Sequence, residues 1–207
     1  MSHYRAVVFD CDSTLSALEG IDALAGDVRD EVRALTEAAM AGEIPLEEVY
    51  GRRLELIRPS RADVEALTAR YIDALVDDAA GVIDALRARD VAVRIISGGL
   101  LPAVAGLAEH LGVPADAVAA VPVRFDDDGA YAGFEAAAPA RAGGKAEVIR
   151  AWRAEGLRGP VMFVGDGATD LEAAGDVDLF VAFAGVVERP EVTAAAPVVV
   201  RSRSLAP

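Results

Sequence analysis

Cysteine and histidine, the residues that build many metal and redox sites, are nearly missing from this sequence. Its 207 residues include one cysteine, Cys11, and two histidines, His3 and His110. A single cysteine cannot form an internal disulfide bond, and so few sulfur and imidazole ligands exclude a metal site built from them. This usage is typical of a reducing compartment and predicts a cytoplasmic protein.

Long apolar runs and positive charge are also scarce. The N-terminal apolar run, 6–9, has the length of one strand, too short for a signal peptide or a membrane span. Twenty basic residues stand against 34 acidic ones, a formal net charge of −14. That charge repels nucleic acid and anionic membranes, so we expect a soluble protein with neither as a partner. A local cluster can still bind a small anion.

The chain length suits one large domain, or a core with a small inserted unit. Apolar periodicity predicts strands at 7–9, 91–96, 161–164, 179–183 and 198–200, and helices at 82–89, 100–111, 144–155 and 171–174. Residues 118–125 and 130–134, on either side of the turn signal at 126–129, predict a hairpin. Strands that alternate with helices indicate an α/β fold, with a parallel sheet covered on both faces.

Residues between about 15 and 75 instead show helical spacing. Apolar residues recur in three stripes, at 28–39, 46–56 and 64–75, which predict a small helical unit. Arg53 shares a stripe with Leu46, Val49 and Leu56, so we expect its guanidinium to face inward. A buried guanidinium needs an anionic partner, which is either a substrate or a carboxylate of the same unit.

Polar clusters lie where predicted strands end. Asp10 and Asp12 are two positions apart, so both can point to one side of the extended chain. Two close carboxylates repel unless a cation or a proton lies between them, which suggests a metal, acid–base chemistry, or both. Asp166 and Asp170 follow another strand and offer the hard oxygen ligands that suit Mg²⁺. Ligands of open α/β sheets bind at this edge.

Two further clusters predict a phosphate site. Ser97, with the glycines after it, is expected to open a helix whose first N–H groups bind phosphate. Lys145 opens another helix, where the helix dipole disfavours a cation, so we expect an anion beside it. This is not a P-loop, because Pro139 replaces the first glycine and Ala146 stands where Ser or Thr is required. Together the clusters predict phosphoryl transfer to a carboxylate.

The motifs resemble, in order and over nearly the whole chain, those of the haloacid dehalogenase-like phosphatases. The match is closest to the members that act on phosphoserine. The residues that carry it are 9–14 (FDCDST), 19–22 (EGID), Met40, 53–60 (RLELIRPS), 95–99 (IISGG), 131–134 (YAGF), 143–145 (GGK) and 165–170 (GDGATD). The resemblance implies a Rossmann-like core, 1–14 and 76–207, and a helical cap, 15–75, inserted after the first strand.

The resemblance also implies catalytic roles. Asp10 would be the nucleophile that forms a phosphoaspartate, and Asp12 the general acid and then the general base. Mg²⁺ would be held by Asp10, Asp166 and the backbone carbonyl of Asp12, with support from Asp170.

Binding roles follow from the same resemblance. The phosphate would be bound by Ser97, Gly98 and Lys145. The substrate would be a small phosphorylated amino acid whose ammonium contacts Glu19 and whose carboxylate contacts Arg53, with Met40, Thr169 and Arg189 close by. Some positions depart from the family pattern: Leu18 replaces a common glutamate, Ala79 and Ala80 stand where a proline is usual, and Ala41 replaces a glycine. The last bears on substrate choice.

Three other functions compete with hydrolysis of phosphoserine, the last step of serine biosynthesis. One is a phosphatase of another small ester, such as phosphohomoserine. Another is a phospho-acceptor switch like a response-regulator receiver, but Asp12 would speed loss of the phosphoryl group that a switch must keep. A helical insert also suits a lid better than a receiver. A dead binding protein is disfavoured because every expected chemical position is filled.

Overall fold

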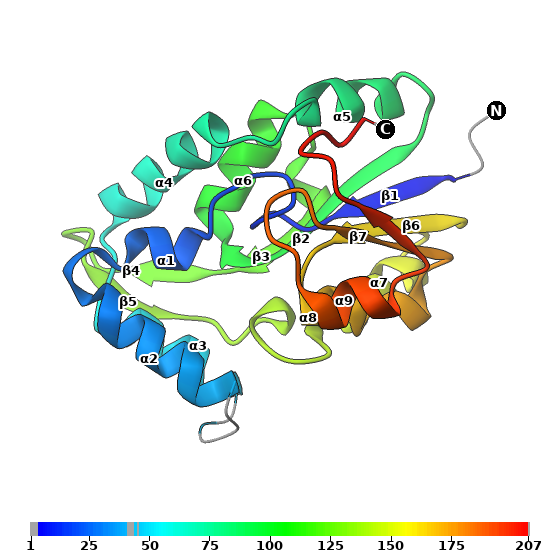
Figure 1. Ribbon diagram of the computed structural model, residues 1–207. Coiled ribbons are helices and arrows are strands. Elements are labelled where there is room, and N and C mark those ends of the chain that lie inside the picture. Colours follow the sequence, from blue (N-terminus) through cyan, green and yellow to red (C-terminus); the bar gives the residue numbers. More distant parts are fainter. Residues whose placement is uncertain (1–3, 41–43, 45, 207) are drawn as a thin grey trace.

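The computed structural model describes residues 4–40, 44 and 46–206. Within them, parallel strands form one six-stranded sheet in the order β3-β2-β1-β6-β7-β8 (Figure 1). Their bounds are β1 (Ala6–Phe9), β2 (Ala92–Leu100), β3 (Val118–Val121), β6 (Val161–Gly165), β7 (Leu179–Phe183) and β8 (Val198–Val200). The predicted α/β class and parallel sheet are confirmed.

Helices cover both faces of this sheet (Figure 1). One face carries α5 (Ala79–Arg87) and α6 (Leu101–His110), and the other carries α7 (Gly144–Ala154), α8 (Ala168–Leu171) and α9 (Pro190–Ala195). Side chains of a strand alternate between its faces, so Val7 and Phe9 of β1 enter the first core, while Ala6 and Val8 enter the second. Burial on both sides explains why this strand is apolar throughout.

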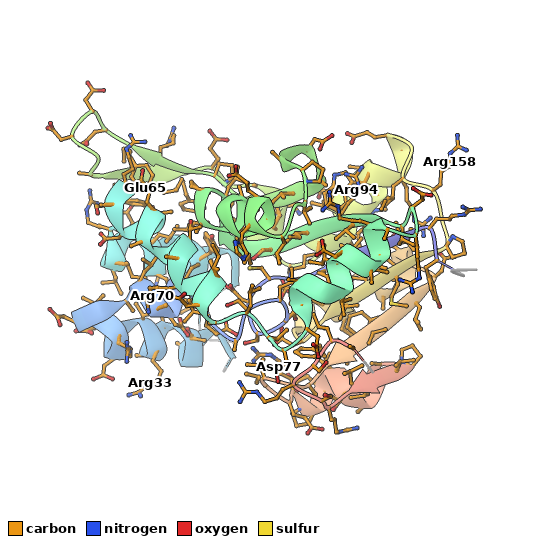
Figure 2. The ribbon with its side chains drawn as sticks, turned by 90° about the horizontal axis from the view of Figure 1, so that it is seen from above. Arg33, Glu65, Arg70, Asp77, Arg94 and Arg158 are labelled. Atoms are coloured by element: carbon orange, nitrogen blue, oxygen red, sulfur yellow. The ribbon has the colours of Figure 1, made fainter. Side chains whose placement is uncertain are left out.

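The chain between β1 and α5 forms the expected helices. They are α1 (Gly20–Leu24), α2 (Arg29–Met40), α3 (Leu46–Ile57) and α4 (Arg61–Asp73). Arg70 of α4 donates a hydrogen bond to the Ala23 carbonyl of α1, which ties these two helices together (Figure 2). Ser60 and Asp63 form a capping box that starts α4.

A two-stranded antiparallel hairpin, β4 (Val123–Phe125) and β5 (Tyr131–Phe134), packs beside these helices. The ring of Phe134 lies 5.3 Å from that of Tyr50 on α3, and the guanidinium of Arg61 lies 5.1 Å from the ring of Phe125. The predicted hairpin is therefore present. Its first strand is shorter than expected, because Pro122 has no N–H to continue the ladder and separates β4 from β3.

Other details of the elements differ from the sequence prediction. Strand β2 does not end at Ser97 but continues to Leu100, and α6 begins only at Leu101. Helix α8 begins at Ala168 rather than at 171, because Asp170 accepts a hydrogen bond from the Gly167 N–H and caps the helix there. On α3 the predicted stripe is partly wrong: Val49 is buried, but Leu56 is 42% exposed.

Candidate active site

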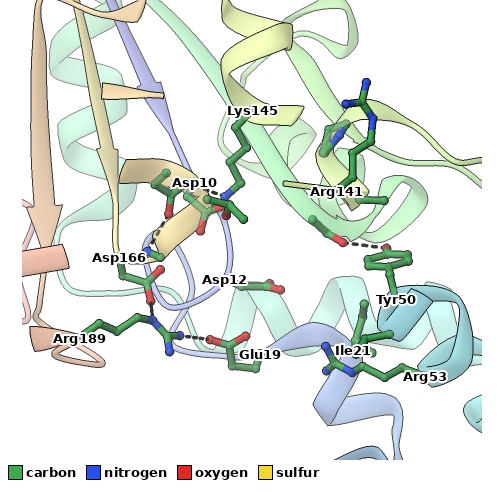
Figure 3. A pocket seen from close by; sticks show the side chains of 17 residues that line it. Asp10, Asp12, Glu19, Ile21, Tyr50, Arg53, Arg141, Lys145, Asp166 and Arg189 are labelled. Atoms are coloured by element: carbon green, nitrogen blue, oxygen red, sulfur yellow. Dashed lines mark hydrogen bonds and ion pairs between the residues drawn. The ribbon is translucent and has the colours of Figure 1, made fainter. Parts of the chain in front are cut away.

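Four side chains from three separate segments meet where β1 and β6 end. Three of them, Asp10, Asp166 and Lys145, are labelled in Figure 3. Asp10 follows β1, Asp166 follows β6, Asp170 lies on α8, and Lys145 lies in the first turn of α7. All four are buried. The Nζ of Lys145 lies 2.7 Å from Asp10 Oδ1 and 2.5 Å from Asp170 Oδ1. The strand-end clusters of the sequence therefore form one site.

The carboxylates of this site repel one another. Ligand oxygens of Asp10, Asp166 and Asp170 all lie within 4.8 Å of one another. Burial and the charge of Asp170 raise the pKa of Asp10 well above its usual range, and the same two causes raise the pKa of Asp166 to about 6. Buried oxygens crowded in this way fit a divalent cation, which would let all three stay ionised.

Lys145 is a buried cation between two anions. Desolvation lowers its pKa, but the charges of Asp10 and Asp170 outweigh that effect and raise the pKa above the ordinary lysine value. The expected anion beside this helix start is present, and it belongs to the protein itself. The close approach needs Gly144, because a Cβ there would lie 1.5 Å from the carbonyl oxygen of Ala138. Glycine thus lets α7 start against the preceding turn.

Asp12 lies apart from the three carboxylates. Its Oδ1 accepts a 2.5 Å hydrogen bond from the Tyr71 hydroxyl, and its Oδ2 faces the Gly20 N–H at 3.4 Å. Burial and the charge of Glu19 raise the pKa of Asp12 to about 7, against the lowering effect of these two bonds. A carboxyl with such a pKa can both give and accept a proton near neutral pH.

Ser97 and Gly98 are positioned by a strand, which corrects the expectation of a helix start. Gly98 lines the cavity, whereas Ser97 is fully buried and its Oγ accepts a hydrogen bond from the Gly99 N–H at 2.9 Å. Because Oγ accepts this bond, its own proton remains free to donate elsewhere. Any phosphate contact here comes from the strand end and not from the first turn of α6.

Charged residues form the outer part of the site. Glu19 accepts hydrogen bonds from the Ser13 hydroxyl at 2.6 Å and from Arg189 at 3.3 Å, and Arg189 also lies 2.9 Å from Asp166. Thr169 lines the same cavity. Glu19 and Arg189 therefore join the helical region to the strand ends.

Arg53 faces the cavity with 19% of its side chain exposed, and it pairs with Asp22 of α1. Its Nε is buried and has no hydrogen-bond partner among the described residues. The sequence left two anionic partners open, a substrate and a carboxylate of the helical region. The Nη2 of Arg53 already binds such a carboxylate, that of Asp22, while Nε is left for a second anion. The side chain of Met40 lies outside the described part of the chain.

Sequence reasoning missed three polar contacts of the site. Tyr71 binds Asp12, Tyr50 donates a 2.8 Å hydrogen bond to the Gly98 carbonyl, and the Thr14 hydroxyl lies 3.3 Å from Asp166. Tyr71 lies on a helical stripe that looked like core, and Tyr50 lies outside the stripe predicted for its helix. Only Thr14 carried a signal, since it belongs to the first strand-end cluster.

A cavity of about 230 Å³ is lined by Asp10, Asp12, Glu19, Tyr50, Arg53, Gly98, Lys145, Asp166, Thr169, Asp170 and Arg189, among others. Residues 7–175 match the family described as haloacid dehalogenase-like hydrolase. The chain belongs to this family. It is 40% identical over 190 residues to the phosphoserine phosphatases of Bos taurus and Homo sapiens, with 90% of this chain and 84% of each relative covered. It is 38% identical to a chloroplastic phosphoserine phosphatase of Arabidopsis thaliana, covering 92% of this chain and 66% of that one.

Solved structures lead to the same family. A phospho-aspartyl intermediate analogue of phosphoserine phosphatase superposes with a TM-score of 0.82 at 28% identity. A substrate-bound phosphoserine phosphatase complex does so with a TM-score of 0.83 at 26% identity. Each alignment covers 99% of this chain and 96% of the other.

None of the helices in the described residues has both the length and the apolar character needed to cross a bilayer.

Proposed function

We propose that this hydrolase is a magnesium-dependent phosphatase that converts O-phospho-L-serine to L-serine and phosphate, the last step of serine biosynthesis. The observation that carries the proposal is that one cavity is lined both by Asp10, Asp12 and Lys145 and by two charged residues, Glu19 and Arg53. The first three suit a phosphate ester. The last two suit the ammonium and the carboxylate of an amino acid.

In the first step, a carboxylate oxygen of Asp10 attacks phosphorus. A bond forms between that oxygen and phosphorus while the bond from phosphorus to the seryl oxygen breaks. Asp12 gives its proton to the leaving seryl oxygen, so serine departs neutral at that atom. A pKa of about 7 keeps this proton available near neutral pH.

In the second step, the ionised Asp12 takes a proton from a water molecule that attacks phosphorus. The bond between phosphorus and Asp10 breaks, phosphate leaves, and both aspartates return to their starting states. Asp12 is well suited to these two tasks because it lies apart from the carboxylate cluster, and Tyr71 fixes one of its oxygens.

The negative charge on the phosphate oxygens needs cations close by. Bound Mg²⁺ would neutralise the phosphate oxygens and the carboxylates. Asp10, Asp166 and the backbone carbonyl of Asp12 would hold it, with Asp170 as support. Lys145 would exchange a carboxylate for a phosphate oxygen, and Ser97 and Gly98 would orient the phosphate.

Residues 15–75 form the proposed cap over a core made of 1–14 and 76–207. Arg53 and Glu19 belong to this cap, so substrate selection and water exclusion would come from one unit. Thr169 and Arg189 would complete the substrate end from the core side. A cytoplasmic location, inferred from the lone cysteine, is part of the same proposal.

The test is phosphate release from a panel of phosphorylated amino acids and sugars, including phosphohomoserine, with and without Mg²⁺. We expect phosphoserine to be the best substrate and a chelator to stop its hydrolysis. Asp10→Asn should abolish turnover and keep the fold, because an amide cannot replace the attacking carboxylate. Substantial activity of Asp10→Asn, or a clear preference for another ester, would reject the proposal as stated.

A further inference from the structure

The Gly98 carbonyl in the cavity wall has a partner that the chemistry above does not use. The hydroxyl of Tyr50 on α3 donates a 2.8 Å hydrogen bond to this oxygen (Figure 3). Both residues line the cavity. The bond is the length of a good O–H···O hydrogen bond, and it connects the helical region to the strand end that carries Ser97.

The backbone at this point has little other support. Register between β2 and β3 runs from the pair Ile96 and Ala119 directly to the pair Leu100 and Val121. Four steps along β2 thus match two along β3, so residues between Ile96 and Leu100 leave the regular ladder. Gly98 and Gly99 lack side chains that could restrict their rotation.

Two hydrogen bonds fix one peptide group in this irregular stretch. The C=O between Gly98 and Gly99 accepts from Tyr50, and the N–H of the same peptide group donates to Ser97 Oγ at 2.9 Å. A peptide group is planar, so these bonds hold the plane from opposite edges. The bond to Gly99 also fixes Ser97 Oγ as an acceptor, which directs the hydroxyl proton away from this peptide.

The Tyr50 ring is itself held in place. It packs against the ring of Phe134 on β5, with 5.3 Å between the ring centroids. The Phe134 ring also lies close to the α3 backbone, since a Cβ at Gly51 would be 3.4 Å from it. Burial raises the pKa of the Tyr50 hydroxyl, so it stays a protonated donor. The hydroxyl therefore has a fixed direction and a fixed role.

We propose that Tyr50 is a positioning residue that orients the Gly98–Gly99 peptide and, through it, the phosphate-binding groups of Ser97 and Gly98. The proposal rests on the phosphatase function above. Tyr50 acts on whatever part of the substrate those groups bind, and that part is the phosphate. Its effect is therefore the same for every phosphate ester, in contrast to the effect of Arg53, which depends on the rest of the substrate.

The test compares Tyr50→Phe with Tyr131→Phe. Each change removes one hydroxyl from a tyrosine near the helices, but the Tyr131 hydroxyl is buried without a hydrogen-bond partner among the described residues. The readouts are KM and kcat for phosphoserine and for p-nitrophenyl phosphate, and the affinity for inorganic phosphate with Mg²⁺, measured by calorimetry. Thermal unfolding monitors the fold.

In Tyr50→Phe we expect phosphate affinity to fall by about two- to tenfold, the range for one neutral hydrogen bond. KM should rise by a similar factor for both esters, and Tyr131→Phe should match the wild type. In the double variant Tyr50→Phe/Ser97→Ala, the effect of Tyr50 should shrink, since both residues act through one peptide.

Unchanged phosphate affinity in Tyr50→Phe would overturn the proposal, as would a loss confined to phosphoserine or an effect fully additive with Ser97→Ala. Hydrolysis by the wild type tests the phosphatase function separately. The calorimetric ratio between variant and wild type needs no turnover, so either idea can fail without the other.

Discussion

The hydrogen bond between Tyr71 and Asp12 leads to a measurable prediction about proton transfer. Tyr71 is fully buried on α4, and its hydroxyl lies 2.5 Å from Asp12 Oδ1. The bond stabilises the ionised carboxylate, so it opposes the burial and the charge of Glu19 that raise the pKa of Asp12 to about 7. Tyr71→Phe keeps the ring and removes only this donor.

The size of the effect follows from the type of bond. A hydrogen bond to a charged group contributes about 1.5–3 kcal/mol. Because one pKa unit corresponds to about 1.4 kcal/mol, the pKa of Asp12 should rise by about one to two units in Tyr71→Phe. In the proposed mechanism Asp12 must be protonated to release serine, so phosphoenzyme formation should slow as pH rises through this pKa. The descending limb of the plot of phosphoenzyme formation rate against pH should therefore move to higher pH by about one to two units.

Rapid-quench measurement of phosphoenzyme formation from phosphoserine, at a series of pH values, gives this limb directly. Tyr131→Phe is the matched control and should leave the limb in place. An ester with a good leaving group, p-nitrophenyl phosphate, needs no acid and should show a weaker limb in all variants. A limb that stays in place in Tyr71→Phe, or moves to lower pH, would refute the reasoning.

Three further changes test other parts of the site. Arg53→Ala should lower kcat/KM for phosphoserine by an amount that corresponds to about 2–5 kcal/mol of activation free energy, and kcat/KM for p-nitrophenyl phosphate much less. Equal losses of kcat/KM for both esters, together with easier unfolding, would instead make the pair with Asp22 structural. In metal-free protein the pKa of Asp166 is raised from 3.8 to about 6. Its contribution to the stability of the fold is therefore fully present below pH 3.8 and is lost as pH rises through about 6. The gain in Tm on adding Mg²⁺ should therefore be larger at neutral than at acidic pH, and an equal gain would contradict this. Gly144→Ala should lower stability by about 1–3 kcal/mol and remove most activity, because its Cβ would strike a backbone oxygen. Gly81→Ala is the control and should change neither, because there is open space around Gly81. A normal Tm for Gly144→Ala would show that α7 can shift freely.

Chemistry at strand ends was predictable from the sequence because its signal is local. Asp10 and Asp166 directly follow apolar runs that can only be buried strands, and parallel strands bring their carboxyl ends to one edge. Lys145 was predictable for a similar reason, since a cation at a helix start needs an anion nearby. The structure brings all three together.

Contacts between distant helices were not predictable in this way. Tyr71 belongs to an apolar helical stripe and Tyr50 does not, and nothing local shows that their hydroxyls reach Asp12 and Gly98. The extension of β2 to Leu100 was missed because two adjacent glycines usually indicate a turn, whereas here tertiary hydrogen bonds keep them extended.

The position of β1 has a consequence for how the protein folds. The first strand lies inside the sheet, and Ala6 pairs with Ala92 of β2 on one side and with Val161 of β6 on the other. During synthesis, the strand that precedes Asp10 must therefore wait for most of the chain before its second neighbour exists. Pairings between such distant segments are slow, because loop closure precedes any gain from the contacts. Asp10 gains Asp166 as a neighbour only when β6 docks, so recovery of activity after denaturation should lag behind recovery of helix content.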